Sequence, residues 1–174
     1  MQQLIKNIEQ WAEDRNLING STPQKQTLKL MEEFGELCRG IARNNPEMIK
    51  DAIGDCFVIL VILNKQKNWD INFDDYQDKM VARFIRSDIF EKDGLSSVEI
   101  THIVATIIPA LYAKAMPPIY NDERYAIWSL LVAFSDIANI YDFSLSDCIE
   151  HAYDQIKDRK GKMIDGVFVK EEDL

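Results

Sequence analysis

The feature that most constrains this chain is an uninterrupted run of eight apolar residues, CFVILVIL, from Cys56 to Leu63. A run of this length is too short to span a bilayer, which needs about 20 residues in a helix. We interpret the surrounding segment, residues 47–67, as a helix. A helix that is apolar on every side belongs in a core, so we expect this one to be buried all round.

Most of the remaining chain also has apolar residues at helical spacing. Thr22 and Pro23 are typical of an N-cap followed by a first helical residue. Asp165 and Gly166 lie between two short β-prone pieces, which predicts a hairpin. The fold class is therefore all-α, a bundle of about seven helices with a small C-terminal β-hairpin. The other predicted helices are residues 2–17, 23–44, 73–88, 97–115, 121–140 and 145–159.

Two segments that begin at Asn68 and Asn139, NWDINFDDYQDKM and NIYDFSLSDCIEHAY, resemble each other at a shift of about 72 residues. We expect residues 1–174 to form a single compact domain, with an internal duplication of 1–90 and 91–174. Ile127 lies opposite Asp55 at this shift, so only the first half would carry the acidic cluster. Chance similarity between amphipathic helices is the alternative.

The formal net charge of -9 argues against binding to nucleic acid, because a phosphate backbone needs clustered cations. The three cysteines are far apart and form no CxxC motif, which favours buried thiols in a reducing compartment. The N-terminal residues lack the apolar region of a signal peptide. We expect a cytoplasmic protein with no membrane partner.

Five carboxylates lie beside the apolar runs, where burial of an isolated charge is costly. At 100° per residue, Glu32, Glu33 and Glu36 fall within roughly a quarter of one helix's circumference. Asp51 and Asp55 are four residues apart and share a face of the next helix. The short connection between the helices favours antiparallel neighbours, which would bring the two acidic faces together.

Converging carboxylates repel one another unless cations neutralise them. Oxygen ligands without His or Cys suit Mg²⁺, or Mn²⁺. A solvated charged face is the alternative interpretation. A basic cluster, Lys157, Arg159, Lys160 and Lys162, lies at the end of the last predicted helix and precedes the hairpin. It could complement the helix dipole or bind phosphate oxygens.

The motif EEFGE, followed by DAIGDC, resembles the EExxE…ExxD signature of the all-α nucleoside triphosphate pyrophosphohydrolases, which include MazG-like proteins and dimeric dUTPases. The tail AYDQIKDRKGKMIDGVFVKEEDL resembles that of short MazG-like proteins of phages and bacteria. The resemblance covers about residues 1–68 and 139–174.

This resemblance implies that Glu33, Glu36 and Asp55 bind metal, with Glu32 as a further ligand or a water-activating group. Glu32 or Glu33 would then orient or deprotonate the attacking water. The sequence departs from the family pattern at Ala52, where a Glu is usual, and Asp51 is the nearest substitute. The predicted metal ligands are thus Glu33, Glu36, Asp51 and Asp55.

The implied reaction is Mg²⁺-dependent hydrolysis of a (d)NTP to the monophosphate and pyrophosphate. Lys157, Arg159 and Lys160 would bind the substrate phosphates, and Trp11 and Asn64 are candidates for contacting the base. Trp11 has the helical spacing of a core residue, and Asn64 lies near a helix end, so each also has a structural interpretation. The resemblance also implies either a dimer or a pseudo-dimeric monomer.

Two other functions stay open. A carboxylate-bridged di-iron bundle requires two ExxH motifs, and the chain has one, from Glu99 to His102, since His151 has no carboxylate three residues before it. A non-catalytic helical protein that binds a nucleotide or a partner, with a decayed site, is favoured by Ala52.

Overall fold

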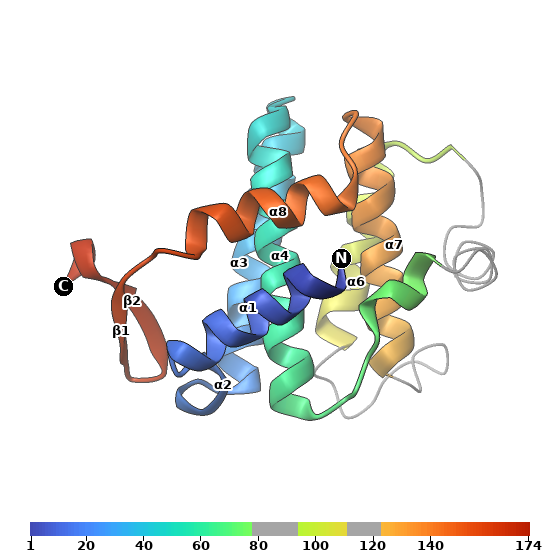
Figure 1. Ribbon diagram of the computed structural model, residues 1–174. Helices are drawn as coiled ribbons and strands as arrows, with labels where there is room; N and C mark the ends of the chain where they lie inside the picture. The colour runs from blue at the N-terminus through green and yellow to red at the C-terminus, as the bar shows by residue number, and fades with distance from the viewer. Residues whose placement is uncertain (78–93, 111–122) are drawn as a thin grey trace.

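The computed structural model describes residues 1–77, 94–110 and 123–174, and these residues fold as an all-α protein, as predicted (Figure 1). A small β-hairpin follows the helices. The elements are α1 (Gln2–Asp14), α2 (Leu17–Gly20), α3 (Pro23–Ala42), α4 (Pro46–Lys67), the 3-10 helix η1 (Phe73–Gln77), α6 (Ser97–Ala110), α7 (Glu123–Ile140), α8 (Leu145–Ile156), β1 (Gly161–Ile164), β2 (Val167–Lys170) and the 3-10 helix η3 (Glu171–Asp173).

The helix start predicted from Thr22 and Pro23 is confirmed. Thr22 accepts a hydrogen bond from the backbone N–H of Lys25 at 3.3 Å, with Pro23 as the first residue of α3. Asn45 caps α4 in the same way, before Pro46. The short α2 was not predicted, and it forms because the chain turns at Asn16, whose φ is 55°.

Three predicted helices extend beyond the described residues. The helix predicted at 73–88 begins as η1, and its remainder lies outside them. Residues 111–115 and 121–122, at the ends of two other predicted helices, also lie outside.

The centre of the core is α4. All residues from Cys56 to Asn64 are buried, with Phe57 and Leu60 at 0% exposure, so the predicted burial on all sides is confirmed for the apolar run. The prediction is wrong for the ends of the helix, where Glu47 and Lys67 are exposed. Helix α3 packs against α4, and α1, α2, α7 and α8 also contact it. The three-residue connection after Ala42 makes α3 and α4 antiparallel neighbours, as predicted.

Helix α8 crosses the α3–α4 pair, and α1 lies beside it (Figure 1). The crossing of α8 over α4 is very close at Gly54. A Cβ on Gly54 would lie 2.2 Å from the carbonyl oxygen of Cys148 and 2.7 Å from the Cβ of Ala152. The glycine next to Asp55 therefore lets another helix approach, and α8 is placed beside the acidic segment of α4.

The C-terminal hairpin is confirmed. Strands β1 and β2 are antiparallel, and Ile164 pairs with Val167. The two turn residues, Asp165 and Gly166, have φ angles of 48° and 76°, as a two-residue type I′ turn requires. The ammonium group of Lys25 donates a hydrogen bond to the carbonyl of Asp165. This contact joins the tip of the hairpin to the start of α3.

Two turns match at the expected shift of 72 residues. Asp70 and Asp142 both have positive φ, at 54° and 62°. Two residues later, Asn72 and Ser144 begin their helices with side-chain hydrogen bonds to Asp75 and Asp147, respectively. In addition, η1 packs on α7 while α8 packs on α4, so each half places a short helix on the long helix of the other. These features support the internal duplication, which stays a prediction.

Among the described residues, no single helix is both long enough and apolar enough to cross a membrane. One pair, Arg124–Ile140 with Leu145–Ile156, meets the length and composition requirements together but is bent by 95°. Most of α7 is buried in the core, which is an ordinary reason for such a composition.

Candidate functional site

The three glutamates of α3 do not share one environment. Glu33 is buried, with 7% exposure, whereas the side chain of Glu32 is 63% exposed. Lys29 bridges these two carboxylates, with its Nζ 2.7 Å from Glu33 Oε1 and 3.0 Å from Glu32 Oε1. Glu36 pairs instead with Arg39, at 3.0 Å. Of the three, Glu33 is the carboxylate that α3 directs into the protein.

Asp55 on α4 is close to the other carboxylates that the sequence predicts for the site. Burial, together with the charges of Glu33 and Asp51, raises the pKa of Asp55 to about 7, although the charges of Arg159 and Lys29 oppose the rise. Glu33, Asp51 and Asp55 therefore interact across the α3–α4 interface. Their repulsion is only partly offset by the two cations, so the group is suited to a further positive charge.

Lys29 was not among the site residues predicted from the sequence. Burial lowers its pKa, but the hydrogen bonds and charges of Glu33 and Glu32 outweigh this effect, and the net pKa is raised. Lys29 is therefore a bound cation that the chain itself supplies. Its spacing before Glu32 and Glu33, three and four residues, is the local signal that could have identified it.

The three predicted phosphate-binding residues differ in their surroundings. Arg159 is close enough to Asp55 for its charge to lower that pKa. Lys157 is exposed and binds Asp154 at 2.6 Å. Lys160 is also exposed. The structure thus brings Arg159 to the acidic cluster, but it does not bring Lys157 to it.

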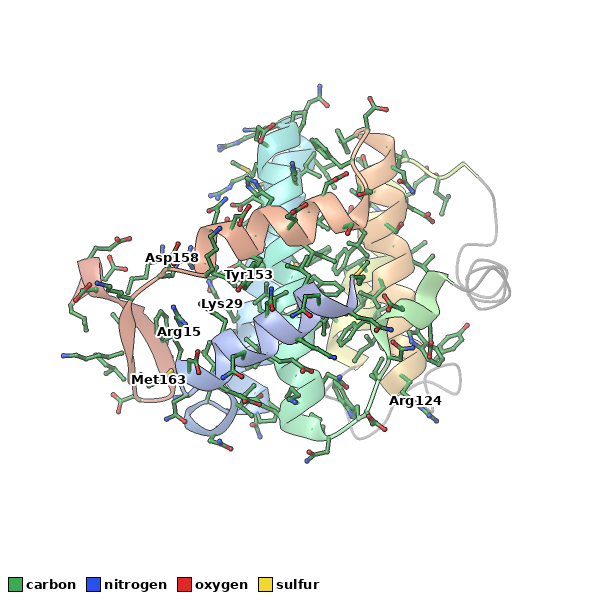
Figure 2. The ribbon with its side chains drawn as sticks, in the orientation of Figure 1. Arg15, Lys29, Arg124, Tyr153, Asp158 and Met163 are labelled. Carbon is green, nitrogen blue, oxygen red and sulfur yellow. The ribbon has the colours of Figure 1, made fainter. Side chains whose placement is uncertain are left out.

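Arg15 was also missed, and it holds the turn that carries Arg159. Its guanidinium donates to the carbonyl oxygens of Arg159 at 2.8 Å and Lys157 at 3.0 Å, and it lies 5.1 Å from the centroid of the Trp11 ring. Arg15 lies where α1 meets the end of α8 and the hairpin, and Lys29 lies in the same part of the molecule (Figure 2). Local periodicity contains no signal for a contact between residues this far apart in the chain.

The end of α8 adds two more polar residues to the site. Gln155 donates to Asp51 Oδ1 at 2.8 Å, and His151 Nε2 lies 3.5 Å from the same oxygen. Neither residue was predicted to lie at this site. His151 was considered only for a second ExxH motif of a di-iron site, and its contact with Asp51 of α4 does not supply that motif.

Both candidate base-binding residues have structural contacts. The indole N–H of Trp11, which is 8% exposed, donates to the carbonyl of Ile156 at 2.7 Å. Asn64 is buried, and its side-chain amide binds both the N–H and the carbonyl of Ile71. Trp11 therefore joins α1 to α8, and Asn64 holds the loop after α4.

In the part of the chain that the structure describes, no three His, Cys, Asp or Glu side chains are arranged to hold a metal ion. The donor chemistry nevertheless fits Mg²⁺. Glu33, Asp51 and Asp55 offer carboxylate oxygens, and their repulsion raises the pKa of Asp55. Glu36 lies on the same helix as Glu33, one turn away. A site built on these four residues stays a prediction.

Together, the fold and the carboxylates define a class: an all-α protein with an acidic cluster between two antiparallel helices and a third that crosses them. Residues 21–88 match the family model of the MazG nucleotide pyrophosphohydrolase domain. The chain therefore contains a MazG-type segment, and the resemblance expected from the sequence is confirmed. This segment includes α3, α4 and all five carboxylates, whereas Arg15, α8 and Arg159 lie outside it.

One relative, from Haemophilus phage HP1 (strain HP1c1), is described as an uncharacterized 18.2 kDa protein in the rep-hol intergenic region. It is 73% identical over 70 residues, which cover 40% of this chain and 43% of the relative. The match thus spans less than half of either protein. No solved structure matches the chain.

Proposed function

We propose that this protein is a Mg²⁺-dependent nucleoside triphosphate pyrophosphohydrolase, which converts a (d)NTP to a (d)NMP and pyrophosphate. The observation that carries the proposal is the position of Asp55. It is partly buried and close to Glu33 and Asp51, its pKa is raised to about 7, and it lies within the MazG-type segment. Carboxylates in mutual repulsion fit a cation, and Mg²⁺ in proteins is commonly shared between carboxylates and substrate phosphates.

Glu33, Glu36, Asp51 and Asp55 would hold the cation. When bound, Mg²⁺ would neutralise charge on the triphosphate and make a water molecule more acidic. Glu32 or Glu33 would accept a proton from that water as its oxygen bonds to the α-phosphorus. The bond from the α-phosphorus to the bridging oxygen then breaks, and pyrophosphate leaves with the electron pair.

Arg159 is the best placed of the three proposed phosphate-binding residues, because its charge already acts on Asp55. Its planar guanidinium suits the oxygens of a phosphate. Lys157 and Lys160 are exposed nearby in the chain and would contact the outer phosphates. Trp11 and Asn64 stay the candidates for the base, although the contacts described above favour packing roles. We also propose that the active form is a dimer or a pseudo-dimeric monomer.

The test is to incubate the full chain with each dNTP and NTP, with Mg²⁺ or Mn²⁺, and to measure pyrophosphate and monophosphate. Glu36→Ala and Asp55→Ala should each lower kcat/KM by more than about 100-fold, beyond the 10–100-fold typical of outer-shell residues. Asp173→Ala, which removes an exposed carboxylate of η3, should leave the rate unchanged. Absence of product with every triphosphate would contradict the proposal.

A non-catalytic helical protein that binds a nucleotide or a partner is the second candidate, and Ala52 favours it. This residue is 2% exposed and contributes no oxygen where the family pattern has a glutamate. Nucleotide binding without turnover in the same samples, measured by calorimetry, would support this alternative.

A further inference from the structure

The polar contact between α4 and α8 involves three residues. Gln155 Nε2 lies 2.8 Å from Asp51 Oδ1 and 2.8 Å from His151 Nε2. His151 Nε2 lies 3.5 Å from the same Asp51 oxygen. Asp51 and Gln155 are 104 positions apart in the chain. The contact therefore joins the MazG-type segment to a helix outside it.

The backbone around this contact is held firmly. At Gly54, less than one turn from Asp51, α8 approaches α4 so closely that a side chain would collide with it. His151 and Gln155 are four residues apart, so both project from one face of α8. Ser144 and Asp147 form a capping box at the start of α8, and Arg15 holds the turn just after its end. The position of Gln155 thus follows from packing that does not depend on Asp51.

The hydrogen-bond chemistry is directional. An amide nitrogen has two protons, so Gln155 can donate one to Asp51 Oδ1 and the other to His151 Nε2. His151 then accepts at Nε2 and carries its own proton on Nδ1. The bond to Oδ1 restrains the rotation of the Asp51 carboxylate and leaves its second oxygen for a cation.

Asp51 requires such a restraint because its position in the helix is unusual. The family pattern offers a carboxylate three residues before Asp55, at the position of Ala52. Asp51 is one residue earlier, which is 100° further round the helix, and its side chain is shorter than that of Glu. It lies 38% exposed, where an unrestrained carboxylate would rotate freely.

We propose that Gln155 is a positioning residue that, together with His151, orients Asp51 as the replacement cation ligand. The second half of the chain then completes the site of the first. This proposal rests on the proposed cation site, and it assigns to α8 the outer-shell role that ligating carboxylates require.

The first test measures Mn²⁺ binding to the full-length chain without nucleotide, by electron paramagnetic resonance of the free ion. Gln155→Ala should weaken Mn²⁺ binding by about tenfold, as loss of an outer-shell partner does. Gln10→Ala is the matched control, because Gln10 donates to Asp14 Oδ1 at the same 2.8 Å on the exposed face of α1. It should bind Mn²⁺ as the wild type does.

Thermal unfolding in EDTA separates positioning from a merely structural role. Both glutamine pairs are exposed, so both variants should unfold within about 2 °C of the wild type, as expected for surface substitutions. Wild-type Mn²⁺ affinity in Gln155→Ala would overturn the proposal. A wild-type chain that binds no Mn²⁺ would overturn both this proposal and the metal-dependent function.

His151→Ala and the double variant test whether the two residues act together. Because His151 contacts Asp51 less closely than Gln155 does, we expect His151→Ala to weaken binding less than Gln155→Ala. The double variant should bind about as well as Gln155→Ala alone, because residues in one network are not additive. Additive losses would contradict joint positioning.

Enzyme kinetics distinguish failure of this inference from failure of the proposed function. In an active enzyme, Gln155→Ala should raise the Mn²⁺ concentration for half-activation by about tenfold, with kcat at saturating Mn²⁺ within about twofold of the wild type. An inactive chain whose Mn²⁺ affinity still depends on Gln155 would support positioning and contradict hydrolysis. An active chain whose Mn²⁺ affinity does not change in Gln155→Ala would support hydrolysis and contradict positioning by Gln155.

Discussion

The raised pKa of Asp55 links the acidic cluster to the stability of the protein. The ordinary pKa of this carboxyl group is 3.8, and burial together with the charges of Glu33 and Asp51 raises it to about 7 in the fold. Between these two values the folded chain keeps a proton that the unfolded chain has released. Raising the pH across this interval therefore favours unfolding. The acidic cluster should make the metal-free protein less stable in neutral buffer than in mild acid.

Asp55→Asn removes this ionisation, so we expect the variant to gain stability relative to the wild type as the pH rises from about 4 to about 7. A shift of about 3 pKa units, at about 1.4 kcal/mol per unit, predicts a relative gain of about 4 kcal/mol at pH 8. Urea unfolding in EDTA at several pH values measures it.

Asp14→Asn, a change on the exposed face of α1, corrects for the general effect of losing one negative charge. If the difference in unfolding free energy between Asp55→Asn and the wild type were the same at pH 5 and pH 8, Asp55 would not have the raised pKa. Mg²⁺ added at pH 8 should reduce the difference in unfolding free energy between Asp55→Asn and the wild type, because a cation favours the ionised form of Asp55.

At this scale, the sequence predicted the residues whose position depends on helical periodicity. Glu33, Asp51 and Asp55 are near one another because α3 and α4 are antiparallel neighbours joined by a short connection, with acidic residues on their facing sides. The periodic pattern did not distinguish buried Glu33 from exposed Glu32, because packing by other elements decides that. Gln155 and Arg15 could not be predicted, since their partners are 104 and 144 positions away.

Among the elements, the crossing of α4 and α8 is the one that shapes the site. Gly54 has no side chain, so the backbone of α8 lies directly against α4 at Cys148. The sequence placed both helices within a few residues of their observed bounds. It did not predict that the two helices cross, because a glycine within a helix does not reveal which other segment packs against it.

Gly54→Ala should destabilise the protein by about 1–3 kcal/mol or more, the usual cost of overpacking. The new Cβ would lie 2.2 Å from a backbone oxygen, so no side-chain rotation relieves the collision. Because α8 must move away, Gln155 should separate from Asp51, and Mn²⁺ binding should weaken in the same variant. Chemical denaturation and Mn²⁺ titration measure the two effects.

Gly35→Ala is the matched control, since Gly35 lies within α3 and a Cβ there would meet nothing within 4 Å. We expect it to stabilise the protein by about 0.5–1 kcal/mol, the usual difference between Ala and Gly inside a helix. Equal effects of the two substitutions would show that α8 does not approach α4 at Gly54.

In the molecule as a whole, the two predicted halves share one core. The buried cluster includes Leu30 and Phe57 from the first half together with Leu130, Phe134 and Ile149 from the second. Each half also packs within itself, α3 against α4 and α6 against α7, and the reciprocal packing of η1 on α7 and of α8 on α4 joins the two halves. The sequence predicted one compact domain. The resemblance between the halves did not predict that each half packs a short helix against the long helix of the other.

A shared core predicts that both halves unfold in one cooperative transition. Trp69 follows α4 and Trp128 lies on α7, so each reports on a different half. Two variants test this: Trp11→Phe with Trp128→Phe, which keeps Trp69, and Trp11→Phe with Trp69→Phe, which keeps Trp128. In each variant, the urea midpoint by fluorescence should equal that by circular dichroism. A fluorescence midpoint below the circular dichroism midpoint in either variant would mean that the half carrying that tryptophan unfolds first. If it were the variant that keeps Trp128, α8 could leave Asp51 while α3 and α4 stay folded.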